Sequence, residues 1–147
     1  MSKFKVLLVS GPNLSILGMR QPEIYGYESL KSYEQEAIAE GLKCDIDVRT
    51  YQSDSEAEIV QVISEGNGTY DAIVINAGAL THYSWSISDA LANFGGKVIE
   101  LHITNPNARA TFRHKSVIAP VSNGLIAGFG IIGYKLAILA VHELLTS

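Results

Sequence analysis

The chain has 147 residues, of which 47% are hydrophobic and 18% are charged; this size and composition predict one globular domain and exclude a disordered or fibrous protein. Eleven Lys and Arg against fifteen Asp and Glu give a net charge of -4, which argues against a nucleic-acid-binding surface because such surfaces need clustered cations. The single cysteine, Cys44, excludes an internal disulfide and is typical of a reducing cytoplasm.

The sequence gives no indication of export or of a membrane span. The N-terminal stretch MSKFKVLLVS has too short an apolar run for a signal peptide. The least charged segment, 116–134, approaches membrane-span length but contains Pro120, Asn123 and four glycines, which favour a buried strand, a turn and a buried helix. We therefore expect a cytoplasmic protein with no membrane association.

Apolar runs of strand length alternate with helical patterns along the chain, which predicts βαβ units and a parallel sheet. In chain order, the predicted elements are a strand at Lys5–Ser10, a helix at Ser29–Lys43, a strand at Asp45–Tyr51, a helix at Ser55–Asn67, a strand at Ala72–Asn76, a helix at Ser84–Phe94, strands at Lys97–His102 and Val117–Pro120, and a helix at Gly124–Leu145.

The helix starts and the number of strands favour one fold class. Ser29 and Ser55 are predicted N-caps, and Ser55 is followed at the capping-box distance by Glu58. Five short strands with intervening helices predict an α/β, flavodoxin-like, doubly wound parallel sheet of order 2-1-3-4-5, with residues 1–147 as a single domain. Such sheets bind ligands beyond the carboxyl ends of their strands, so we expect the functional residues there.

Polar residues collect where the predicted strands end. Asn13 follows the first strand, Asn76 ends the third, and His82 comes shortly after it; Arg113 lies on a predicted short helical stretch, 107–113, after the fourth. The two asparagines could orient a substrate hydroxyl or an enolate oxygen, or they could be ordinary turn residues. His82 could equally be a polar loop residue.

Glu100 and His102 are two residues apart on one predicted strand, so their side chains point to the same face. A carboxylate beside an imidazole fixes its orientation and favours its protonated form, which makes a usable general acid near neutral pH. The alternative is an ordinary ion pair at the end of a strand.

The connection from Leu17 to Tyr27 is long for a compact α/β domain and has Gly18 and Gly26 near its ends. Long loops of this kind are often lids with glycine hinges. Arg20 and Tyr25 could enter the site when the lid closes; alternatively, they are a surface arginine and a packed tyrosine.

Missing motifs narrow the chemistry. The sequence has no G-x-G-x-x-G after the first strand, no P-loop and no G-x-S-x-G, which disfavours a Rossmann or P-loop nucleotide site and a hydrolase elbow. It has no HExxH, and its four histidines lack ligand spacing, so we expect no metal. The remaining groups suit proton transfer on a small anionic substrate without a cofactor.

Five segments taken together resemble the type II 3-dehydroquinate dehydratases. They follow that family's order from Val6 to about Ala140 and read GPNLSILGMRQPEIYG, QSDSEAE, INAGALTHYSWSISDAL, VIELHITNPNARATFRHKS and GLIAGFGIIGY. The resemblance implies a flavodoxin-like fold assembled as a dodecamer of trimers. It also implies the cofactor-free, reversible anti dehydration of 3-dehydroquinate to 3-dehydroshikimate through an enolate, in the shikimate pathway or in quinate catabolism.

By motif position, the resemblance implies five catalytic residues. Tyr25 would be the base that takes the C2 proton, with Arg20 beside it on the mobile loop. His102, oriented by Glu100, would be the acid that protonates the departing hydroxyl. Asn13 would stabilise the enolate through a bound water.

The resemblance also implies six substrate-binding residues. The ring hydroxyls would be held by Asn76, His82 and Arg113, and the carboxylate would be bound by Ile103 and Thr104. The sixth residue, Asp89, would reach the site from a neighbouring subunit. Three features depart from the family's usual pattern, namely Ser10 for asparagine, Thr104 for serine and Ala110-Thr111 for Glu-Glu.

Two other functions remain open from the residues alone. One is a flavodoxin-like module that binds a small anion or a nucleotide without catalysis, since a fold does not fix a function. The other is an enzyme of the same scaffold acting on a related cyclic hydroxy acid. Arg20, Tyr25, Glu100 and His102 together favour the dehydratase, because a pure binder has no need of all four.

Overall fold

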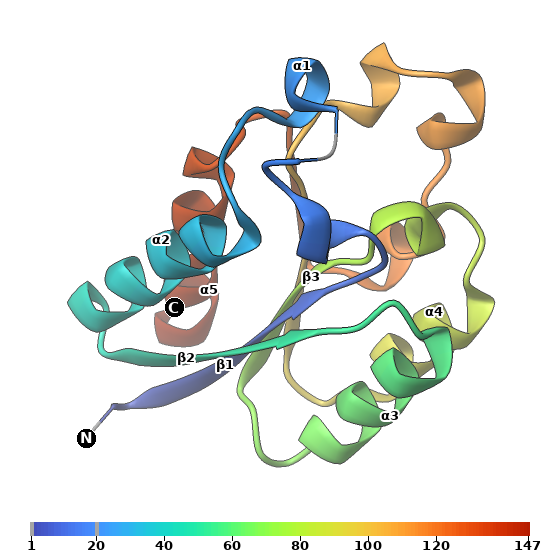
Figure 1. Cartoon of the computed structure of the whole chain (residues 1–147). Helices are drawn as coiled ribbons and strands as arrows, with labels where there is room; N and C mark the ends of the chain where they lie inside the picture. The colour runs from blue at the N-terminus through green and yellow to red at the C-terminus, as the bar shows by residue number, and fades with distance from the viewer. Residues whose placement is uncertain (1, 20) are drawn as a thin grey trace.

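The structure is a computed structural model that describes residues 2–19 and 21–147. Five parallel strands form one sheet in the order β2-β1-β3-β4-β5 (Figure 1), as the sequence predicted. The strands are β1 (Phe4–Ser10), β2 (Ile46–Gln52), β3 (Ala72–Asn76), β4 (Lys97–His102) and β5 (Gly124–Ala127).

The position of each strand in the sheet follows from its sequence. All five residues of β3 are buried, as are Val6 to Ser10 of β1, because central strands of a parallel sheet are covered on both faces and read as continuous apolar runs. At one edge, β2 has the sequence IDVRTYQ and is buried only at Ile46 and Val48. The apolar runs therefore place β1 and β3 at the centre.

Helices cover both faces of the sheet, and two apolar clusters fill the space between them. Figure 1 shows α2 (Leu30–Lys43) and α5 (Ile132–Thr146) on one side and α3 (Glu56–Gly66) and α4 (Trp85–Asn93) on the other. Tyr33 and Tyr134 belong to the first cluster, and Ile63 and Leu91 belong to the second. This two-sided packing leaves the carboxyl ends of the strands for function.

The predicted caps are present. Ser29 Oγ accepts a hydrogen bond from Ser32 N at 3.3 Å, and Ser55 Oγ accepts one from Glu58 N at 3.2 Å. The Glu58 carboxylate accepts a hydrogen bond from Ser53 instead of returning to the Ser55 backbone, whose N–H donates to Ser53 Oγ at 2.9 Å. Ser53 therefore takes the place of the reciprocal half of the capping box.

The C-terminal third differs from the prediction. The fifth strand is Gly124–Ala127, not Val117–Pro120, and the last helix begins at Ile132, not at Gly124. Gly128 and Gly130 have φ angles of 93° and 60°, and these left-handed residues separate the strand from the helix. The apolar run from Gly124 onwards hid that boundary, because a buried strand and a buried helix have similar composition.

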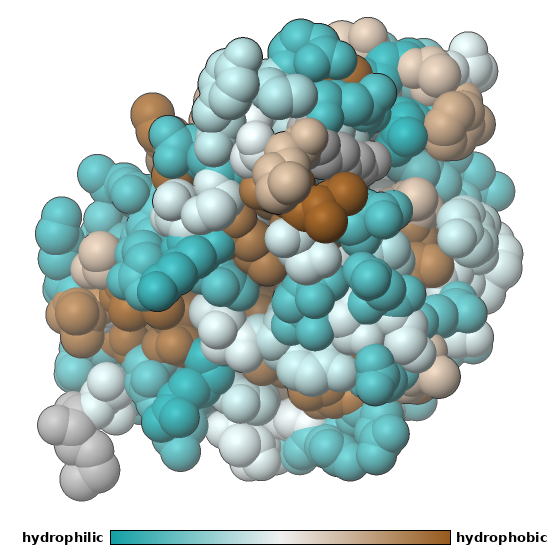
Figure 2. Space-filling model, in the orientation of Figure 1, coloured by the Kyte–Doolittle hydropathy of each residue, from teal (hydrophilic) through white to brown (hydrophobic). Residues whose placement is uncertain are grey.

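Short helical turns occupy the connections beyond the strand ends. They are η1 (Leu14–Ile16), α1 (Pro22–Tyr25), η2 (Gly78–His82), η3 (Pro106–Ala108), η4 (Thr111–His114) and η5 (Ala119–Val121). The predicted helical stretch 107–113 is thus two separate 3-10 turns. On the face in Figure 2, hydrophobic residues form small patches among hydrophilic ones. None of the helices within residues 2–19 and 21–147 is long and apolar enough to cross a membrane.

Candidate active site

A pocket lies beyond the carboxyl ends of β1, β3 and β4, where the sequence predicted the site. It has an empty volume of about 430 Å³, part of it open to solvent. Its lining combines one phenol, two imidazoles, two guanidinium groups and one amide with small and apolar residues: Leu14, Tyr25, Asn76, Gly78, Ala79, His82, His102, Ile103, Thr104, Pro106, Arg109 and Arg113.

Tyr25 reaches this pocket from the end of α1. Its side chain is buried, and its backbone carbonyl accepts a hydrogen bond from the buried Tyr33 hydroxyl at 2.9 Å. The Arg109 guanidinium carbon lies 5.2 Å from the centre of the Tyr25 ring, and Arg109 Nη1 donates to Thr104 Oγ1 at 3.3 Å. A cation in this position is attracted to the electrons of the ring.

Arg109 is a site residue that the sequence reasoning missed. It belongs to the short basic run ARATFRHK. The turn at η3 directs it into the site: Asn105 Oδ1 accepts a hydrogen bond from Asn107 N at 3.0 Å, and Pro106 follows the cap. An Asn-Pro turn was the available signal, but it gives the start of a turn and not the direction of a side chain four residues later.

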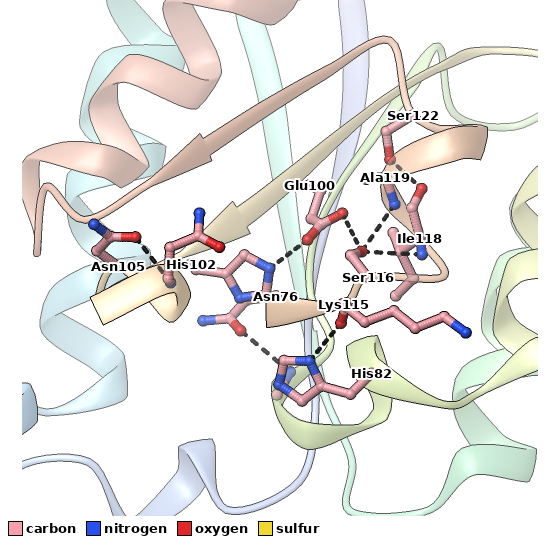
Figure 3. Close-up of polar contacts among 12 residues, drawn as sticks. Asn76, His82, Glu100, His102, Asn105, Lys115, Ser116, Ile118, Ala119 and Ser122 are labelled. Atoms are coloured by element: carbon pink, nitrogen blue, oxygen red, sulfur yellow. Dashed lines mark hydrogen bonds and ion pairs between the residues drawn. The ribbon is translucent and has the colours of Figure 1, made fainter. Parts of the chain in front are cut away.

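Glu100 and His102 lie on the same face of β4, as their spacing predicted. Both are buried, at 1% and 8% exposure, and His102 Nε2 forms a hydrogen bond with Glu100 Oε2. Figure 3 shows the Glu100 carboxylate between the His102 ring and Ser116, whose hydroxyl donates to Glu100 Oε1 at 2.8 Å. Both carboxylate oxygens are thus engaged, and Nδ1 is the ring nitrogen that does not contact Glu100.

Asn76 is held at the end of β3 by both ends of its amide. Its Nδ2 donates to the Tyr134 hydroxyl at 3.3 Å, and its Oδ1 accepts from Gly78 N at 3.2 Å. Burial of Tyr134 raises the pKa of its phenol, so the phenol stays protonated at neutral pH. The two contacts fix the orientation of the Asn76 amide at the pocket.

His82 follows on η2 and also has a fixed ring. Its Nδ1 lies 2.7 Å from the Lys115 carbonyl oxygen, and since a carbonyl only accepts, Nδ1 carries a proton. Nε2 is therefore the nitrogen that can accept or donate elsewhere. The exposed Phe112 ring packs edge-on against the imidazole, with 6.0 Å between ring centres.

Asn13 lies at the end of β1 but is exposed and not among the pocket-lining residues. It has a left-handed backbone, with φ of 68°, and its N–H donates to Asp54 Oδ1 at 3.0 Å. Gln52 Nε2 donates both to Asp54 Oδ1 at 3.1 Å and to the Gly11 carbonyl at 3.2 Å. The QSDS segment, which begins at the last residue of β2, thus holds the turn that carries Asn13.

The other predicted residues are divided between the pocket and its surroundings. Ile103, Thr104 and Arg113 line the pocket. Asp89 does not; it is exposed on α4. Arg20 lies outside the described residues, so its predicted position beside Tyr25 stays a prediction. Among the residues described, no group of three or more His, Cys, Asp or Glu side chains is arranged to hold a metal ion.

Comparisons with known proteins find similar sequences and structures over nearly the whole chain. The model of the family described as dehydroquinase class II matches residues 4–142. A 3-dehydroquinate dehydratase of Bacillus cytotoxicus is 45% identical over 139 residues, which cover 95% of each chain. Solved type II dehydroquinases from Propionibacterium acnes and Butyrivibrio crossotus superpose with TM-scores of 0.92 and 0.91 at 37% and 44% identity. They cover 97% and 94% of this chain, and 98% and 97% of their own chains are matched.

Proposed function

The chain belongs to the class II dehydroquinase family, and on this premise we propose that it is a 3-dehydroquinate dehydratase, a hydro-lyase of the shikimate pathway. It removes water from 3-dehydroquinate to give 3-dehydroshikimate, and quinate catabolism is the alternative pathway. The observation that carries the proposal is one pocket lined by a buried phenol, Tyr25, and by His102, whose ring bonds Glu100. A base and an acid beside one cavity are what an elimination requires.

In the reaction, the Tyr25 phenolate takes the proton from C2, and the electron pair of that C–H bond moves into an enolate. The carbonyl re-forms, the carbon–oxygen bond to the leaving hydroxyl breaks, and His102 donates the proton that completes a water molecule. Tyr25 then returns its proton to solvent and His102 regains one. The Arg109 guanidinium carbon is 5.2 Å from the Tyr25 ring centre, so a positive charge lies beside the base.

Other roles follow the family pattern. Arg20 assists Tyr25, and Asn13 acts on the enolate through a water. Because Asn13 is exposed in its turn, this role requires a water between its amide and the substrate. The ring hydroxyls and the carboxylate of the substrate are bound by Asn76, His82, Arg113, Ile103 and Thr104.

We place the enzyme in the cytoplasm, with residues 1–147 as one catalytic domain and a homododecamer of trimers as its assembly. Asp89 completes the site of a neighbouring subunit, which is consistent with its exposure on α4 away from the pocket of its own chain. Large exposed apolar side chains support an assembly, including Trp85 at 62% and Phe112 at 63%.

The first test is to add 3-dehydroquinate to the protein and follow the absorbance of the conjugated product. Turnover that survives borohydride treatment excludes a Schiff-base route. In Tyr25→Phe, the loss of the base lowers kcat by at least about a hundredfold with little change in KM. Tyr27→Phe is the matched control, since Tyr27 is 84% exposed on the same loop. Near-normal turnover of Tyr25→Phe contradicts the assignment of the base, and binding without turnover by the wild type favours the non-catalytic module.

A further inference from the structure

The Ser116 hydroxyl makes three hydrogen bonds, which together determine the direction of its proton. Its Oγ accepts hydrogen bonds from two backbone N–H groups, those of Ile118 at 3.1 Å and Ala119 at 2.9 Å. The same oxygen lies 2.8 Å from Glu100 Oε1. Figure 3 shows these three contacts converging on one atom.

A serine hydroxyl has two lone pairs and one proton. Both lone pairs of Ser116 are occupied by the N–H groups of Ile118 and Ala119, so the proton must go to Glu100. The two N–H dipoles also polarise the hydroxyl and make it a stronger donor. Glu100 in turn accepts at Oε1, so its buried side chain has a hydrogen-bond partner at this oxygen.

We propose that Ser116 is a positioning residue of the dehydratase, acting through Glu100 on His102. Its hydroxyl fixes the plane of the Glu100 carboxylate. Oε2 of that carboxylate then holds His102 Nε2 and leaves Nδ1 for the substrate. The proposal rests on the proposed function, because it assigns to Ser116 the alignment of the acid that protonates the leaving hydroxyl.

The segment around Ser116 is held in place from the other side. Val117 N donates to the Thr81 carbonyl at 2.9 Å, and the Lys115 carbonyl bonds His82 Nδ1. Two consecutive residues, Lys115 and Ser116, therefore set the orientations of both imidazoles of the pocket. The rigidity of this segment allows a single hydroxyl to control the position of a carboxylate.

The test compares four variants of the full-length protein. Ser116→Ala lowers kcat about ten- to a hundredfold with KM nearly unchanged, because one hydrogen bond to a buried charge is lost while the substrate contacts remain. Ser116→Thr restores most of kcat, and Ser116→Cys, a weaker donor, gives an intermediate value. Ser122→Ala is the matched control, since Ser122 Oγ donates to the Ile118 carbonyl at 2.8 Å in the same turn, and it keeps wild-type kcat. If Ser116→Ala fails to fold, the Cys variant decides.

A double-mutant cycle separates positioning from general destabilisation. In a Glu100→Gln background, Ser116→Ala costs less than threefold in kcat, because the residue through which it acts is already altered. Losses that multiply in the double variant overturn the proposal, as does wild-type kcat in Ser116→Ala or Ser116→Cys.

NMR of histidine labelled with ¹⁵N provides a test that does not depend on turnover. The downfield Nε2–H signal of His102 weakens or moves in Ser116→Ala but not in Ser122→Ala; an unchanged signal refutes the positioning role even if the substrate assignment is wrong.

Discussion

The buried hydroxyl of Tyr33 ties the loop that carries Tyr25 to helix α2. It donates to the Tyr25 backbone carbonyl at 2.9 Å, one of the carbonyls at the end of α1 that lack a partner within the helix. Tyr33→Phe removes this oxygen and keeps the ring, which is 2% exposed and lies 5.2 Å from the Tyr134 ring centre. The substitution therefore tests one hydrogen bond without opening a large cavity.

The expected loss in free energy of unfolding is about 1–2 kcal/mol, because a buried hydrogen bond is lost. For a domain of this size, that lowers the thermal midpoint by about 2–8 °C. Hydrogen exchange should locate the change. Amides at the end of α1 should exchange faster in the variant, such as that of the C-cap residue Gly26, which donates to the Pro22 carbonyl at 2.7 Å. Those of β3 should keep their protection.

The control is Tyr27→Phe, which removes an exposed hydroxyl and should change stability by less than about 0.5 kcal/mol. Equal thermal midpoints for wild type and Tyr33→Phe would refute the anchoring role. Faster exchange spread evenly over α1 and β3 would also count against it, since that pattern indicates global destabilisation.

Two further predictions concern a close backbone contact and alkaline stability. A Cβ on Gly11 would lie 2.5 Å from the Ala77 carbonyl oxygen, so Gly11→Ala should lower the free energy of unfolding, measured in urea, by about 1–3 kcal/mol. The control is Gly124→Ala, whose Cβ would meet only the end of the Ile99 side chain at 3.4 Å. Equal losses of stability in the two variants would contradict the clash at Gly11. Burial raises the pKa of Tyr134 above its ordinary value of 10.0. As the pH rises, the phenol therefore loses its proton in the unfolded chain before it does so in the folded protein. The contribution of the protonated phenol to the free energy of unfolding is full below about pH 10 and is lost as the pH rises further. Urea unfolding between pH 8 and 11 should show this decline, and Tyr134→Phe should flatten it; an unchanged slope would mean that other groups cause it.

The sequence predicted four of the five strands to within one residue at each end, because their apolar runs are bounded by turn residues. It also predicted that Asn76, His82, Glu100 and His102 lie at one edge of the sheet, since parallel strands end together. This prediction needs only the positions of the strands and the alternation of side chains between the two faces of each strand. Contacts that depend on the geometry of loops could not be predicted from the sequence in this way.

Arg109 illustrates that limit. Two arginines, Arg109 and Arg113, lie four residues apart, and both line the pocket. A single short helix over 107–113 would have given them one face, but the two 3-10 turns are separated at Ala110. Arg109 extends over Tyr25, and the Arg113 guanidinium carbon lies 4.8 Å from the Phe112 ring centre. The break between the turns therefore gives the two arginines different aromatic contacts.

The incorrect fifth strand has the same kind of cause. Val117 and Ile118 are buried and apolar, as a strand residue would be. A strand beside β4 needs free backbone N–H groups. Here the N–H groups of Ile118 and Ala119 bond Ser116 Oγ, and Pro120 has none. The side chain of Ser116 thus prevents this segment from joining the sheet, and the edge of β4 pairs with Gly124–Ala127 instead. The interaction that made the strand prediction wrong is the one that directs the Ser116 proton towards Glu100.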